Sequence, residues 1–268
     1  MPDVHYPDGH TLHFHKTGTG KTVVLWFHGF GQNHLAFNKI IEPDQQEFTH
    51  YIFDLFYHGN SVWASNTPIK KHTWKELIQR FLDENGITQF HVVAFSIGCR
   101  FGVTIAEQFP NQVQTLTLLA PDGIQFRFWY ALVTYPYLSR KLFHRIVTKP
   151  ALWNRLLSVL EFTRIIDRKL LRFAQRQMDS EQKRSQVYNS WVNFRHLKSH
   201  ATKLGQLANH HKMHITLVAG TRDKIVPATL VQKLQYRMPQ LHYHSLNANH
   251  NELIGMSSNL IFKLLHNQ

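Results

Sequence analysis

The sequence predicts an α/β fold built around a mostly parallel sheet that helices cover on both faces. Short apolar runs of strand length are rich in Val, Ile and Phe and show no polar alternation, and helix-compatible stretches separate them. Such strands are typical of parallel sheets buried on both faces. The 268 residues, 43% of them hydrophobic, suit one large α/β domain that carries an insertion.

The elements are expected in the following order along the chain. Residues 4–15 alternate apolar and polar around Pro7-Asp8-Gly9, which predicts a hairpin. Strands are predicted at residues 23–27, 51–53, 90–94, 115–120, 215–219 and 241–246. Helices are predicted at residues 73–85, 97–109 and 253–265.

The excess positive charge of the chain lies in one segment, residues 124–213. The net charge is +13, and this segment holds 17 Lys or Arg against 4 Asp or Glu. It is also rich in aromatic residues and has mostly helical spacing. We therefore expect a charge-balanced core, residues 1–123 and 214–268, and a helical, basic and aromatic cap, residues 124–213.

The basic cap is open to three interpretations. It can be a solvated helical face whose aromatic residues pack onto the core. Basic and aromatic residues together also suit contact with an anionic membrane surface or a lipid substrate. Nucleic-acid binding is disfavoured, because no known nucleic-acid motif accompanies the charge.

The chain is expected to be cytoplasmic. Its N-terminus lacks a basic region followed by an apolar stretch, and no apolar run approaches the roughly 18 residues of a membrane span. The one cysteine, Cys99, cannot form an intramolecular disulfide, which fits a reducing compartment.

Ser96 is the predicted nucleophile. It lies in Ala94-Phe95-Ser96-Ile97-Gly98, where a predicted strand gives way to a predicted helix. A strand-to-helix turn of the G-x-S-x-G type presents the serine hydroxyl to substrate. Ala94 replaces the first glycine, which the fold accepts if strand and helix pack around one extra methyl group.

Asp223 and His250 complete a predicted catalytic triad. A histidine can take the proton of a serine, and an aspartate can fix the tautomer of that histidine. All three residues follow predicted strands, whose carboxyl ends meet at one edge of a parallel sheet. Asp122, which follows the strand at 115–120, is the competing acid; we favour Asp223 and expect Asp122 to shape the start of the insertion.

The backbone N–H groups of Phe30 and Ile97 are the predicted oxyanion donors. Ile97 follows the nucleophile at the start of a helix. Phe30 lies in His28-Gly29-Phe30-Gly31, directly after the first core strand. Two such N–H groups stabilise the oxyanion of an acyl-transfer reaction.

These motifs make the chain resemble α/β-hydrolase-fold proteins of the capped, esterase- and lipase-like kind. The matching segments are residues 28–31, 54–61, 94–98, 220–223, Val226-Pro227 and His250. The resemblance implies an eight-stranded sheet flanked by helices, with a lid inserted after the sixth strand. It also implies hydrolysis through an acyl-enzyme, without a metal or organic cofactor. Asn249 departs from the family pattern, because relatives often have glycine before the histidine.

The 20 histidines raise the question of a metal site. Two clusters lie on strand-like segments, where alternate residues share a face: His10, His13 and His15, and His242 and His244. No carboxylate or cysteine lies at a matching spacing, so no metal ligand is predicted. His28, His58 and Asp54 are expected to support loops rather than to act as acids or bases.

The predicted function is a serine hydrolase that cleaves a carboxylic ester of a largely apolar small substrate. Serine at position 96 disfavours the carboxylate nucleophile of epoxide hydrolases and dehalogenases. Two alternatives stay open. The same triad can serve a carbon-carbon bond or amide hydrolase or an acyltransferase, and the chain can be an inactive hydrolase-fold protein whose basic cap binds a membrane or a polyanion.

Overall fold

The computed structural model describes residues 3–6, 8–41, 47–124, 128–163, 171, 175, 177–238 and 240–266. The chain divides into two compact units. The core unit comprises Met1–Ser65, Ile69–Gln125 and Leu197–Gln268, and the helical unit comprises Asn66–Pro68 and Phe126–His196.

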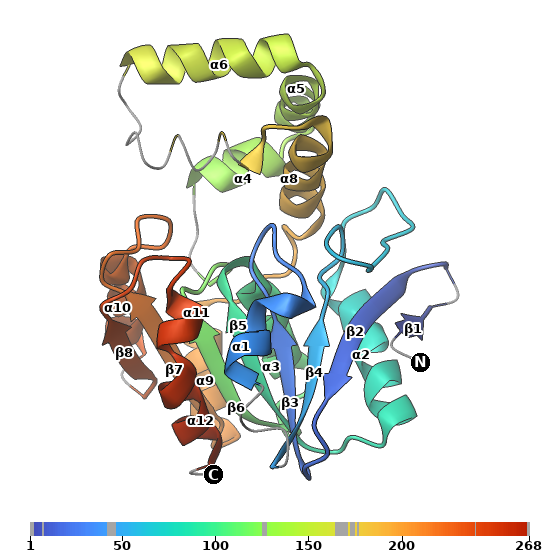
Figure 1. Ribbon diagram of the computed structural model, residues 1–268, viewed down its shortest axis with the longest axis vertical. Coiled ribbons are helices and arrows are strands. Elements are labelled where there is room, and N and C mark those ends of the chain that lie inside the picture. The colour runs from blue at the N-terminus through green and yellow to red at the C-terminus, as the bar shows by residue number, and fades with distance from the viewer. Residues whose placement is uncertain are drawn as a thin grey trace. The chain divides into compact units, whose positions relative to one another are not determined.

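The described residues of the core unit form one eight-stranded sheet, with strand order β1-β2-β4-β3-β5-β6-β7-β8 (Figure 1). The strands are β1 (Asp3–His5), β2 (Thr11–Thr17), β3 (Thr22–Phe27), β4 (Phe48–Phe53), β5 (Phe90–Phe95), β6 (Val113–Leu119), β7 (His214–Gly220) and β8 (His242–Leu246). β2 pairs antiparallel with β1 and β4, and all other pairs are parallel. The mostly parallel sheet predicted from the sequence is confirmed.

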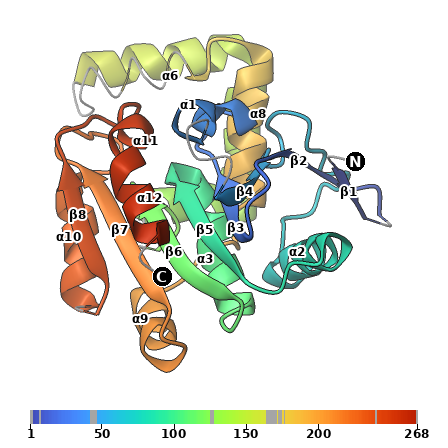
Figure 2. The same cartoon turned by 60° about the horizontal axis from the view of Figure 1, so that its bottom comes forward.

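Helices cover both faces of this sheet (Figure 1, Figure 2). One group of packed helices is α2 (Lys71–Asn85), α3 (Cys99–Gln108), α9 (Ala201–His210) and α10 (Ala228–Arg237), and the other is α1 (Asn38–Ile41), α11 (Leu253–Met256) and α12 (Ser258–His266). Neighbouring residues of β3 contact opposite groups. The Trp26 ring lies 6.5 Å from that of Phe262 on α12, and the Phe27 ring lies 6.0 Å from that of Trp74 on α2. The central strand therefore shows no polar alternation.

β4 begins earlier than the sequence predicted. It starts at Phe48 rather than at residue 51, and all six of its residues are buried. Thr49 and His50 interrupt the apolar run that marks a strand, but each forms a side-chain hydrogen bond inside the protein. The Thr49 hydroxyl donates to the Gly20 carbonyl at 2.6 Å, and Trp26 Nε1 donates to His50 Nδ1 at 3.1 Å. Buried polar residues in hydrogen bonds are compatible with a central strand.

The helical unit contains α4 (Phe128–Thr134), α5 (Tyr137–Thr148), α6 (Pro150–Thr163) and α8 (Glu181–Asn193). α5 packs against the other three helices. The buried Arg184 on α8 donates from Nε to the carbonyl of Val147 on α5 at 2.8 Å. The insertion follows β6, the sixth strand. The sequence predicted that the insertion ends at residue 213. In the structure residues 197–213 belong to the core unit, because α9 packs against α3 and α10.

Among the described helices, none combines the length and the apolar character that crossing a membrane requires.

Gly102 makes room for the methyl group of Ala94, the residue that departs from the elbow motif. A Cβ built at Gly102 on α3 would lie 3.0 Å from Ala94 Cβ and 3.3 Å from Val92 Cγ1. Both neighbours are fixed to the buried strand β5 and cannot move far without disturbing close packing. Strand and helix therefore pack around the extra methyl group because a glycine faces it.

We expect Gly102→Ala to lower the free energy of unfolding by about 1–3 kcal/mol, because it overpacks the contact between α3 and β5. In an Ala94→Gly background Gly102→Ala should destabilise the protein less. The methyl group of Ala94 is then absent, so the gain in helix propensity of about 1 kcal/mol is offset by a smaller steric conflict. Urea unfolding of the four proteins measures this coupling. Gly255→Ala is the control, because its Cβ would meet nothing within 4 Å. Additive effects at positions 94 and 102 would contradict the proposed contact.

Candidate active site

Ser96 lies at a sharp turn between β5 and α3. Its φ of +52° is in the left-handed region, which is strained for a residue with a side chain. The turn continues through the 3₁₀ segment η3 (Ser96–Gly98) into α3. A Cβ at Gly98 would lie 2.4 Å from the carbonyl oxygens of Phe27 and His28, so only glycine fits there. This is the geometry of a nucleophile elbow.

Folding brings Ser96, Asp223 and His250 together from the ends of three strands. His250 Nδ1 lies 2.6 Å from Asp223 Oδ2, and His250 Nε2 lies 3.1 Å from Ser96 Oγ. The other Asp223 oxygen accepts the N–H groups of Ile225 at 2.8 Å and Val226 at 2.9 Å. The carboxylate is therefore oriented from both sides, and the imidazole has one nitrogen for it and one for the serine.

Asp122, the competing acid, has a different partner. Its Oδ2 accepts a hydrogen bond from Arg100 Nε at 2.7 Å. Its backbone N–H donates to the Ser96 carbonyl at 3.3 Å, so it lies near the elbow without facing His250 as Asp223 does.

The loop after β3 is held by His28. Leu55 N–H donates to His28 Nε2 at 3.0 Å, so Nδ1 carries the proton and donates to the Gly29 carbonyl at 2.7 Å. Complete burial, together with a smaller effect of the neighbouring His58, lowers the pKa of His28 to about 3. His28 is thus a neutral loop anchor. The N–H of Phe30 has no hydrogen-bond partner among the described residues and remains available as an oxyanion donor.

Comparison with known proteins agrees with this fold. A family model described as alpha/beta hydrolase fold matches residues 22–254. The chain belongs to the alpha/beta hydrolase fold family. Its fold is similar to that of a thermophilic esterase from Thermogutta terrifontis, with a TM-score of 0.72 at 16% identity, over 100% of this chain and 97% of the esterase.

Curated relatives in this family match part of the chain. It is 35% identical over 107 residues to "Probable lysophospholipase BODYGUARD 5" of Arabidopsis thaliana, which is 37% of this chain and 24% of that protein. It is 31% identical over 119 residues to the dihydrolipoyllysine-residue acetyltransferase component of an acetoin cleaving system of Cupriavidus necator, which is 43% of this chain and 31% of that protein. The matches span a quarter to a third of these relatives.

Within this hydrolase fold, Asp54 orders the loop that follows β4. Its Oδ2 accepts the N–H of Asn60 at 2.8 Å, and its Oδ1 accepts that of His34 at 2.7 Å. Burial acts to raise the pKa of Asp54, but the hydrogen bonds from Asn60 and His34 outweigh it and leave the pKa below its usual value. A Cβ at Gly59 would collide with this carboxylate, which explains the glycine in the loop.

The loop that carries His250 has supports that the sequence interpretation missed. Asn249 Oδ1 accepts the N–H of Glu252 at 3.1 Å, and Glu252 Oε2 accepts the N–H of Asn249 at 2.9 Å. Arg222, next to Asp223, donates to the same Glu252 oxygen at 2.8 Å. The spacing Asn-x-x-Glu is a capping-box pattern that could have revealed the pair. Asn249 thus has a structural use at the position where relatives often have glycine.

Buried neutral histidines should make the fold sensitive to acid. Burial lowers the pKa of His91 from 6.5 to about 4 and that of His58 to about 4. Between pH 6.5 and pH 4 these histidines bind protons in the unfolded chain but not in the folded one. Their contribution to the free energy of unfolding is therefore complete above pH 6.5 and is lost as the pH falls toward 4. Each histidine contributes up to about 1.4 kcal/mol per pH unit in this window.

Urea unfolding at several pH values between 7 and 4.5 measures this slope. His91→Gln should reduce it, because one of the buried titrating groups is removed. His72→Gln on α2 is the control, since its side chain is exposed. An unchanged slope in His91→Gln would contradict the neutral, buried state of His91.

Proposed function

We propose that the chain is a serine hydrolase that cleaves carboxylic esters. The observation that carries the proposal is the contact of one imidazole, that of His250, with both Asp223 Oδ2 and Ser96 Oγ, at 2.6 Å and 3.1 Å. A hydroxyl, an imidazole and a carboxylate in this order are the parts of a nucleophilic acyl-transfer site. The family membership and the esterase-like fold agree with this reaction.

The reaction follows from these contacts. His250 Nε2 takes the Ser96 proton as Oγ attacks the ester carbonyl, and Asp223 stabilises the imidazolium that forms. The N–H groups of Phe30 and Ile97 stabilise the oxyanion. The imidazolium then donates its proton to the departing alcohol, which leaves an acyl group on Ser96. Water attacks this ester with His250 again as the base and regenerates the free serine.

A largely apolar substrate is the class that best fits the surroundings of the triad. The Phe95 ring packs 4.8 Å from that of His250, and Phe30 lies in the loop that supplies an oxyanion donor. One curated relative is named a probable lysophospholipase and another an acetyltransferase component. We therefore infer an ester with an apolar acyl chain as substrate, and keep acyl transfer to an alcohol or thiol as the alternative. Adding such acceptors to the ester assay separates transfer from hydrolysis.

Ser96→Ala should lower the kcat for a p-nitrophenyl ester by on the order of 10⁴-fold or more, because it removes the nucleophile. Asp223→Asn should lower kcat by about 10⁴-fold, because it disturbs the tautomer of His250. Asp122→Asn is the matched control: its carboxylate pairs with Arg100, so we expect a kcat within about tenfold of the native value. A loss of kcat of about 10⁴-fold in Asp122→Asn, together with a native kcat in Asp223→Asn, would exchange the roles of the two acids.

Labelling by a fluorophosphonate probe tests the same nucleophile without a chosen substrate. We expect labelling of the native chain and none of Ser96→Ala. Absence of labelling in the native chain, together with no ester turnover, would favour the inactive scaffold over the enzyme.

A second proposal concerns the helical unit, which we infer to contact anionic lipid surfaces. On α4, Phe128 is 60% exposed and Trp129 is 74% exposed; on α5, Leu138 is 78% exposed. Lys141 and Arg145, one turn apart on α5, are exposed as well. Aromatic and aliphatic side chains beside cations suit the boundary between anionic headgroups and acyl chains. The surface charge favours an anionic lipid over a neutral one.

Co-sedimentation with vesicles measures this contact. Binding should rise with phosphatidylserine content and fall with added salt, because cations in the helical unit attract the surface. Lys141→Glu with Arg145→Glu should weaken binding by at least about tenfold, at about 1 kcal/mol per charge. Lys75→Glu on α2 of the core unit is the matched control and should bind as the native chain does. Equal binding to neutral vesicles would contradict the proposal.

A further inference from the structure

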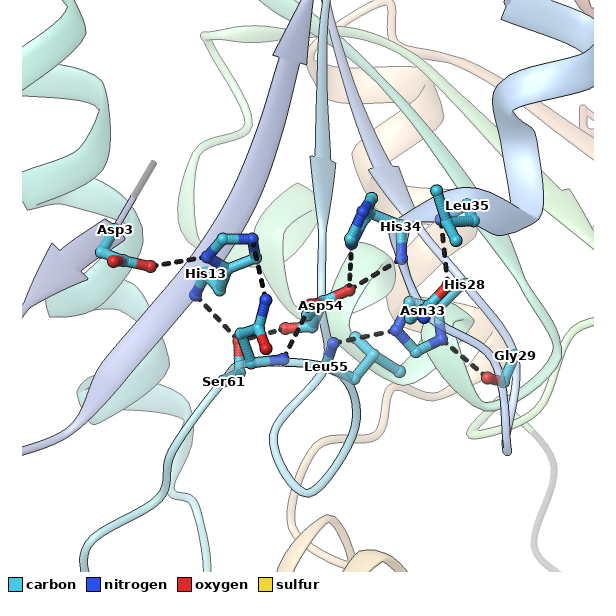
Figure 3. Close-up of polar contacts among 11 residues, drawn as sticks. Asp3, His13, His28, Gly29, Asn33, His34, Leu35, Asp54, Leu55 and Ser61 are labelled. Carbon is cyan, nitrogen blue, oxygen red and sulfur yellow. Dashed lines mark hydrogen bonds and ion pairs between the residues drawn. The ribbon is translucent and has the colours of Figure 1, made fainter. Parts of the chain in front are cut away.

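Folding gathers two histidines and a carboxylate that are far apart in the sequence. His13 lies on β2, His34 begins the 3₁₀ segment η1 (His34–Phe37), and Asp54 follows β4 (Figure 3). One ligand atom from each lies within 4.8 Å of the other two. Imidazole nitrogen and carboxylate oxygen are ligands that zinc and similar ions prefer. Asp54 thus supplies the carboxylate that sequence spacing did not reveal.

His13 is oriented as a metal-binding histidine would be. Its Nδ1 lies 2.7 Å from Asp3 Oδ1, which fixes the proton on Nδ1 and leaves the Nε2 lone pair for a ligand bond. A carboxylate behind the remote nitrogen is the usual arrangement for histidines that bind metals. Nε2 lies 3.5 Å from Asn60 Nδ2, which is a long hydrogen bond at best.

His34 and Asp54 are also close enough to share one ion. His34 Nδ1 lies 3.1 Å from Asp54 Oδ1. Two ligands about 2.0 Å from a tetrahedral ion lie roughly 3.3 Å apart, so a small movement suffices. The N–H groups of Asn60 and His34 donate to the carboxylate at 2.8 Å and 2.7 Å and hold it in place.

The cluster is reachable from solvent although Asp54 is fully buried. The His13 and His34 side chains are 15% and 20% exposed, and Asp54 is 0% exposed. Both imidazoles are therefore in contact with solvent, whereas the carboxylate is shielded from it. Hydrogen bonding alone accounts for the contact between His34 and Asp54. It does not account for a second imidazole that points a poorly satisfied nitrogen toward the same place.

We propose that His13, His34 and Asp54 bind one divalent transition-metal ion, for which Zn²⁺ is the best match. Three protein ligands leave the fourth position of a tetrahedral ion to water. Binding through His34 Nδ1 requires the imidazole proton to lie on Nε2 instead of on Nδ1, where it is donated to Asp54. The site is separate from the triad, because its ligands come from β2, η1 and the end of β4.

The ion would add a coordinate link between three segments that hydrogen bonds and ring contacts already connect. One of them, η1, follows the turn at residues 28–31 that carries the Phe30 N–H. We therefore expect Zn²⁺ to raise the thermal midpoint of the native chain, because a ligand that binds only the folded state stabilises it.

The experiment uses the full chain without an affinity tag, stripped with a chelator and titrated with Zn²⁺ against a chromophoric competitor. We expect one equivalent to bind, and Co²⁺ to give the intense visible absorption of tetrahedral coordination. His13→Ala and His34→Ala should each weaken binding at least tenfold and abolish the rise in thermal midpoint. Asp3→Asn should weaken it about 10- to 100-fold, as loss of the carboxylate behind a ligating histidine does.

His15→Ala is the matched control, because His15 stacks on the His34 ring without belonging to the ligand set. It should change the affinity less than threefold. Circular dichroism of the stripped variants checks that each is folded, and Asp54 is left intact because its carboxylate also orders the loop after β4. Absence of stoichiometric binding to the folded native chain would overturn the proposal. So would native affinity in the variant that combines His13→Ala with His34→Ala, since the ion would then lie at other histidines.

Discussion

The close approach of Gly98 to the end of β3 is the constraint on which the candidate site depends. No side chain fits at this position, because a Cβ would lie 2.4 Å from the carbonyl oxygens of Phe27, which ends β3, and of His28, which follows it. The elbow therefore presses against the same residues that begin the loop of Phe30. Ser96 and the oxyanion loop gain a fixed separation from backbone packing alone. The strained φ of Ser96 persists because the buried strands on either side leave the turn no room to relax.

The sequence was sufficient to predict the sheet, and to predict that Ser96, Asp223 and His250 meet, because each of these residues follows a predicted strand. Ser96, Asp223 and His250 stand where β5, β7 and β8 end or shortly after, and parallel strands share one carboxyl edge. The same rule could not find the start of β4, where His50 is polar but buried in a hydrogen bond with Trp26. Patterns of hydropathy report burial, and they fail where a polar side chain finds its partner inside the protein.

The cluster of His13, His34 and Asp54 could not be predicted for a different reason. Spacing rules compare residues within one helix or strand, whereas these residues come from three segments. They meet because β2 runs antiparallel beside β4, so that the Asp54 N–H donates to the His13 carbonyl at 2.9 Å. That pairing depends on the strand order of the sheet, which no local pattern encodes. The same holds for Arg222 and Glu252, which connect the loops of Asp223 and His250.

The environment of each ring decides what a histidine does in a chain that has 20 of them. His28 has both nitrogens in hydrogen bonds and is fully buried, so it stays neutral and holds a loop. His250 and His13 each have a carboxylate at Nδ1, that of Asp223 and that of Asp3, but they differ in the group at Nε2. A serine hydroxyl at Nε2 makes the pair suited to proton transfer. A second imidazole and a carboxylate near Nε2 make it suited to a metal ion instead. Two copies of one carboxylate–imidazole unit can thus serve different chemistry on one sheet, because the group at the far nitrogen differs.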